Sequence, residues 1–289
     1  MPVASINGVE LYYEEVGEGL ALLFCHEFAG DYRSWAPQVR FFARRYRTIV
    51  FNARGYPPSS VPTDPAAYSE ELSVEDAYGL IRHLGIDRAH VCGLSMGGAV
   101  ALKLGIAHPE VSRSLVVAGA GYGSTNHEQF VREANATAEM FEREGAKRAT
   151  EVYARGPSRQ RFLAKDPQGW GEFLDLLKTH SAVGSAHTLR RVQARRRTIY
   201  EVGDELPAMA IPTLVIVGDE DELCLEPGLF MKRRLPNAGL AIFPKTGHTM
   251  NLEEPALFNQ TVLDFLTAVE QDRWTPRTDA ASTSILPEM

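Results

Sequence analysis

Val91-Cys92-Gly93-Leu94-Ser95-Met96-Gly97-Gly98-Ala99-Val100 is the stretch that decides the fold of this 289-residue chain. An apolar run leads into it and good helix formers follow it, so the pattern predicts a strand, a tight turn and a helix. Gly93, Ser95 and Gly97 match the G-x-S-x-G nucleophile elbow. In such a turn the serine backbone is strained, and glycines on either side leave room where side chains would collide. The stretch therefore predicts an exposed serine hydroxyl at the start of a helix, whose amide groups stabilise an oxyanion.

The composition is typical of a soluble globular protein, with 44% hydrophobic and 23% charged residues. The net charge of −7 disfavours nucleic acid or an anionic membrane as a partner. No apolar run reaches the roughly 20 residues that a membrane span requires. Cys25, Cys92 and Cys224 form no C-x-x-C pair or zinc spacing, so we expect no metal and no cofactor. The start of the chain lacks a signal-peptide pattern, which predicts a cytoplasmic protein.

Strand and helix patterns alternate along most of the chain. Apolar strand patterns cover residues 20–25, 47–51, 89–92, 114–118, 213–217 and 240–243, and a hairpin around Asn7-Gly8 covers residues 3–16. Helical patterns cover residues 34–45, 74–84 and 256–269, and another runs from the elbow to near His108. Strands that alternate with helices predict an α/β fold, with a mostly parallel sheet covered on both faces.

This alternation breaks once. Residues 122–207 carry several helical patterns and no clear strand, which predicts a helical cap over the carboxyl edge of the sheet, where ligands bind. We therefore expect a core built from residues 1–121 and 208–271, with the cap inserted between its two parts. Residues 272–289 lack periodicity, and we expect an extended or mobile tail there.

Four separated motifs carry a resemblance to a known family. They are His26-Glu27-Phe28-Ala29-Gly30, Asn52-Ala53-Arg54-Gly55-Tyr56, Gly93-Leu94-Ser95-Met96-Gly97-Gly98, and Gly218-Asp219-Glu220-Asp221 together with Gly247-His248. Over about residues 5–270 the chain resembles the α/β-hydrolase superfamily, in its helical-cap branch of esterases, lactonases, C–C bond hydrolases and cofactor-free haloperoxidases. The resemblance implies an eight-stranded type of mostly parallel sheet, with helices on both faces and a helical cap insertion.

The same resemblance assigns roles to residues of this chain. Ser95 is the expected nucleophile and His248 the base that takes its proton. Asp219 and Asp221 both follow the strand at residues 213–217, and in family members with a similar G-D-x-D run the second acid orients the histidine. We therefore expect Asp221 to do so, with Asp219 as a turn-capping residue. Glu222 fits this role less well because its side chain is longer.

The resemblance also implies an oxyanion hole built from the backbone amides of Phe28 and Met96. Glu27 stands where the family usually has glycine, so it would be strained if this position needs a positive φ. Otherwise Glu27 forms a hydrogen bond near the pocket, or faces the active site and alters its chemistry. In the motif that begins with Asn52, the family prefers an acid first, and we expect both Asn52 and Arg54 to be structural.

The predicted cap supplies candidate pocket residues. They are Tyr122, Phe130, Met140, Phe162, Trp170 and Phe173, although most aromatic residues at helical spacing belong to a core. His26, Glu27, Tyr122 and Trp170 are the possible pocket residues that we single out. The basic run Arg190-Arg191 and Arg195-Arg196-Arg197 is interpreted first as a solvated helix face, and second as an attractor for carboxylated substrates.

These observations predict a serine hydrolase that acts on a small ester, thioester or lactone through an acyl-enzyme. The alternatives are a C–C bond hydrolase of a vinylogous diketone, and a hydrolase-like receptor that binds a ligand without turnover. A serine at the elbow argues against haloalkane dehalogenase or epoxide hydrolase chemistry, which in this fold uses a carboxylate there. The only partner we expect is a small acyl substrate, for a monomer or homodimer.

Overall fold

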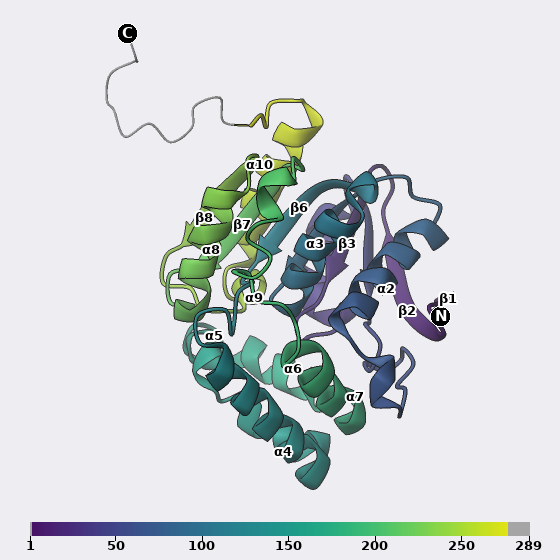
Figure 1. Cartoon of the computed structure of the whole chain (residues 1–289), viewed down its shortest axis with the longest axis vertical. Helices are drawn as coiled ribbons and strands as arrows, with labels where there is room; N and C mark the ends of the chain where they lie inside the picture. Colours follow the sequence, from purple (N-terminus) through teal and green to yellow (C-terminus); the bar gives the residue numbers. More distant parts are fainter. Residues whose placement is uncertain (1, 277–289) are drawn as a thin grey trace.

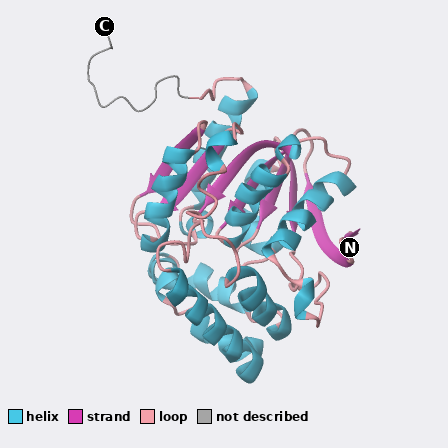
Figure 2. Cartoon of the chain, in the orientation of Figure 1, coloured by secondary structure: helices cyan, strands magenta, loops and turns pink. Residues whose placement is uncertain are grey.

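The computed structural model describes residues 2–276 and contains one eight-stranded sheet at its centre (Figure 2). The strands lie in the order β1-β2-β4-β3-β5-β6-β7-β8. Their bounds are β1 (Val3–Ile6), β2 (Val9–Val16), β3 (Ala21–Cys25), β4 (Arg47–Phe51), β5 (Ala89–Leu94), β6 (Ser112–Ala118), β7 (Thr213–Gly218) and β8 (Ala238–Phe243). The pairs β1·β2 and β2·β4 are antiparallel and the other pairs are parallel. The predicted α/β fold with a mostly parallel sheet is therefore confirmed.

The helices follow the strands as the alternation predicts. The α-helices are α1 (Ala36–Phe42), α2 (Glu70–His83), α3 (Met96–Ala107), α4 (His127–Tyr153), α5 (Gln160–Lys165), α6 (Pro167–Leu177), α7 (Ala182–His187), α8 (Glu222–Arg234), α9 (Met250–Glu253) and α10 (Pro255–Glu270). Short 3₁₀ helices are η1 (Tyr32–Trp35), η2 (Pro65–Ala67), η3 (Pro109–Val111), η4 (Pro157–Arg159) and η6 (Leu206–Ala208), and η5 (Thr188–Gln193) is a π-helix.

Neighbouring residues of each central strand point to opposite faces of the sheet, and each face buries its own core. Leu23 of β3 belongs to the core beneath α2, α3 and α8, whereas Leu22 and Phe24 belong to the core beneath α1 and α10. Because both faces are covered, the central strands consist of continuous apolar runs, which is the pattern that predicted them.

Some boundaries differ from the sequence prediction. The helix expected at residues 74–84 begins at Glu70, because the Ser69 side chain accepts a hydrogen bond from the amide of Leu72 and caps the helix there. Helix α8, which the patterns did not predict, contains Pro227 in its interior and has a mixed polar sequence. Local preference therefore gave little indication of α8, which packs on β7 and β8.

Between β6 and β7 the described chain contains only helices and connecting segments, and we call α4 to α7 the cap helices. Figure 1 shows them gathered at one end of the sheet. Helix α4 is interrupted at Gly145, whose φ of 74° breaks the helical path. The cap helices bury their own apolar cluster, which also includes Phe28 and Met96 of the sheet-bearing part. The cap helices are thus packed directly over the loops at the carboxyl ends of the strands.

The expected tail at residues 272–289 lies mostly outside the described residues, which end at 276. Within its first part, Trp274 packs edge-on against Phe265 at 4.7 Å, and its indole N–H donates to the carbonyl oxygen of Asn237 at 3.1 Å. Trp274 is held at the sheet edge because an aromatic ring finds apolar contact and a hydrogen-bond acceptor there. The residues on either side of it are exposed.

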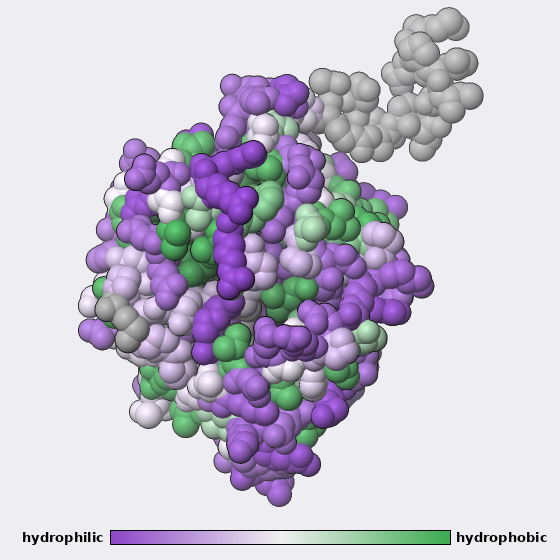
Figure 3. Space-filling view, turned by 180° about the vertical axis from the view of Figure 1, so that it is seen from behind, coloured by the Kyte–Doolittle hydropathy of each residue, from purple (hydrophilic) through white to green (hydrophobic). Residues whose placement is uncertain are grey.

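The surface mixes polar and apolar residues. On the face seen in Figure 3, hydrophobic residues lie in small groups between hydrophilic ones. Among residues 2–276 we find no helix with the length and apolar character needed to cross a bilayer.

Candidate active site

Ser95 stands between β5 and α3 in a strained backbone conformation, with a φ of 56° and a ψ of −110°. A Cβ atom added at Gly93 would overlap the carbonyl of Gly97, and one added at Gly97 would overlap the carbonyl of Cys25. The amide of Ser95 is held by the carbonyl of Ala118 at 2.8 Å. These contacts explain why the elbow needs glycine on both sides of the serine, and they present the Ser95 side chain at the carboxyl edge of the sheet.

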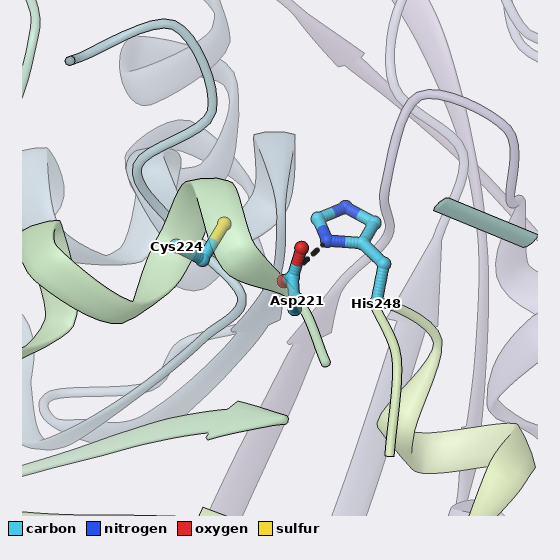
Figure 4. Close-up of side chains that lie close together, drawn as sticks. All are labelled: Asp221, Cys224 and His248. Atoms are coloured by element: carbon cyan, nitrogen blue, oxygen red, sulfur yellow. Dashed lines mark hydrogen bonds and ion pairs between the residues drawn. The ribbon is translucent and has the colours of Figure 1, made fainter. Parts of the chain in front are cut away.

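His248 and Asp221 come from the loops that follow β8 and β7, and their side chains meet. Nδ1 of His248 donates to Oδ2 of Asp221 at 2.7 Å, and both residues are buried (Figure 4). A carboxylate can only accept, so this bond leaves Nε2 of His248 free to act as a base. Asp219 instead accepts from the amide of Thr246 at 3.1 Å, which is the turn-capping role expected for it. The structure thus brings Asp221, and not Asp219, to the histidine.

Cys224 lies beside this pair. The ligand atoms of Asp221, Cys224 and His248 lie within 4.8 Å of one another, which is a distance that metal ligands can have (Figure 4). However, burial raises the pKa of the Cys224 thiol well above its usual range, and the thiol donates to the carbonyl of Gly119 at 3.2 Å. A thiolate is the form that binds metals. The donor set therefore suits hydrogen bonding between the acid and the histidine better than metal binding.

Ser95 and His248 line the same cavity of about 320 Å³, which lies between the sheet edge and the cap helices. Its wall is mostly apolar and consists of Phe28, Ser95, Tyr122, Phe130, Glu133, Ala134, Thr137, Met140, Val152, Tyr153, Gly156, Pro157, Ser158, Leu189, Gln193, Arg196 and His248. Within residues 2–276 the structure records no hydrogen bond of the Ser95 side chain. Ligand-free serine hydrolases often have such loose geometry, which tightens when substrate binds.

The loop after β3 carries Phe28, which lines this cavity. Nδ1 of His26 donates to the carbonyl of Glu27 at 2.7 Å, and Nε2 accepts from the amide of Ala53 at 3.0 Å. These two bonds define one neutral tautomer, and burial lowers the pKa of His26 to about 4. The Tyr56 hydroxyl donates to the carbonyl of Phe28 at 2.9 Å. His26 and Tyr56 therefore fix the loop, so that the Phe28 peptide has one orientation.

Glu27, the departure from the family pattern, pairs with an arginine of the cap. Its carboxylate bonds the guanidinium of Arg159, and both side chains are at most 2% exposed. The arginine also stacks against Tyr153 at 5.8 Å and Phe173 at 5.5 Å. Glu27 is not among the residues with positive φ, so the expected strain is absent. The carboxylate points to the cap and ties it to the loop that carries Phe28.

We expect the Glu27–Arg159 pair to behave as one unit in folding. Replacing either partner alone (Glu27→Gln or Arg159→Met) should lower the free energy of unfolding by about 3–5 kcal/mol, because it leaves a buried charge without a partner. The double variant should lose less than the sum of the single losses. Urea unfolding of the four proteins measures this coupling, and additive losses would show that the pair contributes nothing as a pair.

The structure corrects three of the expected pocket residues. Tyr122 lines the cavity, but His26, Glu27 and Trp170 do not. His26 is held between its own loop and the amide of Ala53 after β4, and Glu27 is turned toward Arg159. Trp170 is buried within the cap, where its indole N–H donates to the carbonyl of Ala154 at 3.0 Å. In each case a hydrogen-bond partner that is not visible in the sequence directs the side chain away from the cavity.

Two further loops support the site. Arg54 forms a bidentate pair with Asp76, with both bonds at 2.7 Å, and Asn52 donates to the carbonyl of Pro57 at 2.8 Å, which confirms their structural roles. Glu253, whose role the sequence did not reveal, accepts from the amides of Gly247 at 2.8 Å and Thr249 at 3.1 Å. This carboxylate therefore holds the main chain on both sides of His248.

Comparison with known proteins agrees with this geometry. The family model described as "Alpha/beta hydrolase family" matches residues 22–261. This chain belongs to the alpha/beta hydrolase family. The hydrolase is 27% identical over 252 residues to 3-oxoadipate enol-lactonase 1 of Acinetobacter baylyi, which covers 86% of this chain and 90% of that protein. It is also 29% identical over 278 residues to a 2-hydroxy-6-oxononadienedioate/2-hydroxy-6-oxononatrienedioate hydrolase of Burkholderia vietnamiensis, covering 90% of this chain and 92% of that protein.

A solved structure gives the same result for the fold. The enol-lactonase from Burkholderia xenovorans LB400 superposes on this hydrolase with a TM-score of 0.81 and 26% sequence identity. The match covers 92% of this chain and all of the lactonase. Since these relatives are named as two lactonases and a hydrolase, the comparison supports a hydrolytic enzyme with an alpha/beta hydrolase fold.

Proposed function

We propose that this hydrolase cleaves a small carboxylic ester, thioester or lactone through an acyl-enzyme on Ser95. The observation that carries the proposal is the arrangement at one cavity wall. A strained serine at the head of α3 and a histidine bonded to Asp221 at 2.7 Å line the same space. The names of the lactonase relatives favour the same bond class. In this proposal the cap helices complete the cavity and shape it for the substrate.

In the acylation step, Oγ of Ser95 attacks the carbonyl carbon while Nε2 of His248 takes the hydroxyl proton. The carbonyl oxygen becomes an oxyanion, for which the amides of Phe28 and Met96 are the donors. Met96 is the first residue of α3, so its amide has no partner inside the helix. His248 then gives its proton to the leaving oxygen or sulfur as the bond to the carbon breaks. The acyl group remains on Ser95.

Deacylation repeats these steps with water. His248 takes a proton from the water as its oxygen attacks the acyl carbon, and the proton returns to Oγ of Ser95 as the carboxylic acid leaves. Asp221 keeps its hydrogen bond to Nδ1 throughout and stabilises the cationic ring. Tyr122, whose ring lies 5.3 Å from that of His248, remains a neutral phenol, because burial raises its pKa and the nearby Asp221 carboxylate raises it further.

A second candidate is hydrolysis of a C–C bond in a vinylogous diketone. The observation that favours it is the 29% identity to the nonadienedioate hydrolase described above. The same serine and histidine would serve it, so the two candidates differ in substrate rather than in the residues used.

Labelling with a fluorophosphonate together with ester turnover tests the proposal. The expected result is one covalent adduct on the peptide that contains Ser95, and hydrolysis of p-nitrophenyl acetate or butyrate that the label stops. Tight binding of acyl ligands without turnover of any ester, thioester or lactone would contradict the proposal and favour a receptor. Turnover confined to a vinylogous diketone would favour the C–C hydrolase.

A further inference from the structure

Arg196 is a buried cation in the wall of the cavity that holds Ser95 and His248. It is 9% exposed, and its guanidinium stacks on Phe130 at 5.1 Å. It belongs to the basic run whose first interpretation was a solvated helix face. Arg195 and Arg197 of that run are exposed, but Arg196 is turned inward. Since arginine keeps its charge in proteins, this wall carries a positive charge inside an otherwise apolar cavity.

Within residues 2–276 Arg196 has no carboxylate at ion-pair distance, in contrast to the buried Arg159 and the mostly buried Lys103. Arg159 is paired with Glu27, and Lys103 is paired with Glu70. Among residues 2–276 the Arg196 guanidinium donates one hydrogen bond, from Nη2 to the carbonyl of Tyr122 at 2.6 Å. Burial lowers the pKa of Arg196, and the carboxylate of Glu70, which is itself paired with Lys103, offsets this effect only in part. Its remaining N–H groups can bind an anion.

The same contacts place this charge close to the proposed chemistry. Arg196 holds the main chain of Tyr122, and the Tyr122 ring packs edge-on against His248 at 5.3 Å. Glu133, the one carboxylate in the cavity wall, is exposed and accepts from Gln129 at 2.8 Å. A small anion can therefore reach Arg196 from inside the cavity, while the reacting carbonyl lies at Ser95.

We propose that Arg196 is a carboxylate subsite, and that the substrate of this hydrolase is an ester, thioester or lactone that also carries a carboxylate. This inference rests on the proposed function and names the substrate class of that site. The planar guanidinium fork matches a carboxylate, and in a cavity of about 320 Å³ an acid group on a short acyl or leaving-group chain lies within reach of it. The bond places a counter-charge in direct contact with the guanidinium, for which residues 2–276 provide no carboxylate at ion-pair distance.

Paired esters test this subsite. The first pair places the carboxylate on the acyl chain, and its ratio is the kcat/KM for the p-nitrophenyl half-ester of succinate divided by that for p-nitrophenyl butyrate. The second pair places it on the leaving group, and its ratio is the kcat/KM for 4-butyryloxybenzoate divided by that for phenyl butyrate. At least one ratio should exceed one and fall about 10- to 100-fold in Arg196→Gln, because a charged hydrogen bond is lost. Arg196→Lys keeps the charge and should lose less. The matched control Arg195→Met removes an exposed neighbouring charge and should leave the ratios as they are.

Ratios that do not change in Arg196→Gln, or that fall equally in Arg195→Met, would overturn the subsite. Calorimetric binding of glutarate and of glutaramide to Ser95→Ala gives a readout that needs no turnover. Glutarate should bind more tightly than the amide, and this preference should disappear in Ser95→Ala/Arg196→Gln. If that holds while no ester is cleaved, the proposed function fails and the subsite stands. If esters are cleaved with no dependence on Arg196 in either measurement, the subsite alone fails.

Discussion

Ser95→Ala should lower kcat for p-nitrophenyl butyrate by roughly 10⁴- to 10⁶-fold, because the acyl-enzyme no longer has an oxygen on which to form. The elbow explains why no other residue takes over. Its strained backbone presents this hydroxyl at the head of α3, and His248 lines the same cavity. Alanine fits the same backbone conformation, so we expect the variant to fold. Steady-state turnover with circular dichroism of both proteins measures the effect.

Ser158 offers the matched control, since it lines the same cavity but lies in the cap. Ser158→Ala should change kcat far less than Ser95→Ala does. Equal losses in the two variants, or ester turnover that survives in Ser95→Ala, would show that Ser95 is not the nucleophile.

Asp221→Asn should lower kcat by roughly 10³- to 10⁴-fold, with a smaller change in KM. An amide at this position is similar in shape, but it cannot stabilise the cationic ring, and it favours the wrong tautomer of His248. The 2.7 Å bond between Nδ1 and Oδ2 is therefore expected to matter in the transition state more than in substrate binding. Measuring kcat and KM separately over a range of pH distinguishes a loss in the transition state from a loss in substrate binding.

Asp219→Asn is the control for the choice between the two acids. Its side chain accepts from the amide of Thr246, and an asparagine oxygen can accept the same bond. We expect Asp219→Asn to keep activity within about tenfold of the parent protein. If Asp219→Asn were the more damaging of the two, the orienting acid would be assigned to the wrong residue.

Local patterns in the sequence were sufficient to predict the fold class and the serine of the elbow, and they indicated candidates for its partner residues. The hairpin at Asn7-Gly8 formed as predicted, with φ values of 47° and 76° in a two-residue turn. Ser95 was predicted because its strained turn requires glycine two positions before and two positions after the serine. This spacing can be recognised within the five residues 93–97. The positions of Asp221 and His248 after their strands made them candidates, because parallel topology brings those loops together at one sheet edge. The choice of Asp221 over Asp219 came from the resemblance to the family.

The tertiary structure alone decided where the longer side chains point. Glu27 and Arg159 are 132 residues apart in the chain, so no local pattern could reveal their pairing. Within one run of basic residues, Arg195 and Arg197 face solvent while Arg196 enters the cavity, and the sequence shows no difference between them. A charged or aromatic side chain goes where it finds a partner that offsets its desolvation, and such partners are contributed by distant segments. The sequence thus determined the backbone and the serine of its elbow, whereas long-range contacts determined the cavity around it.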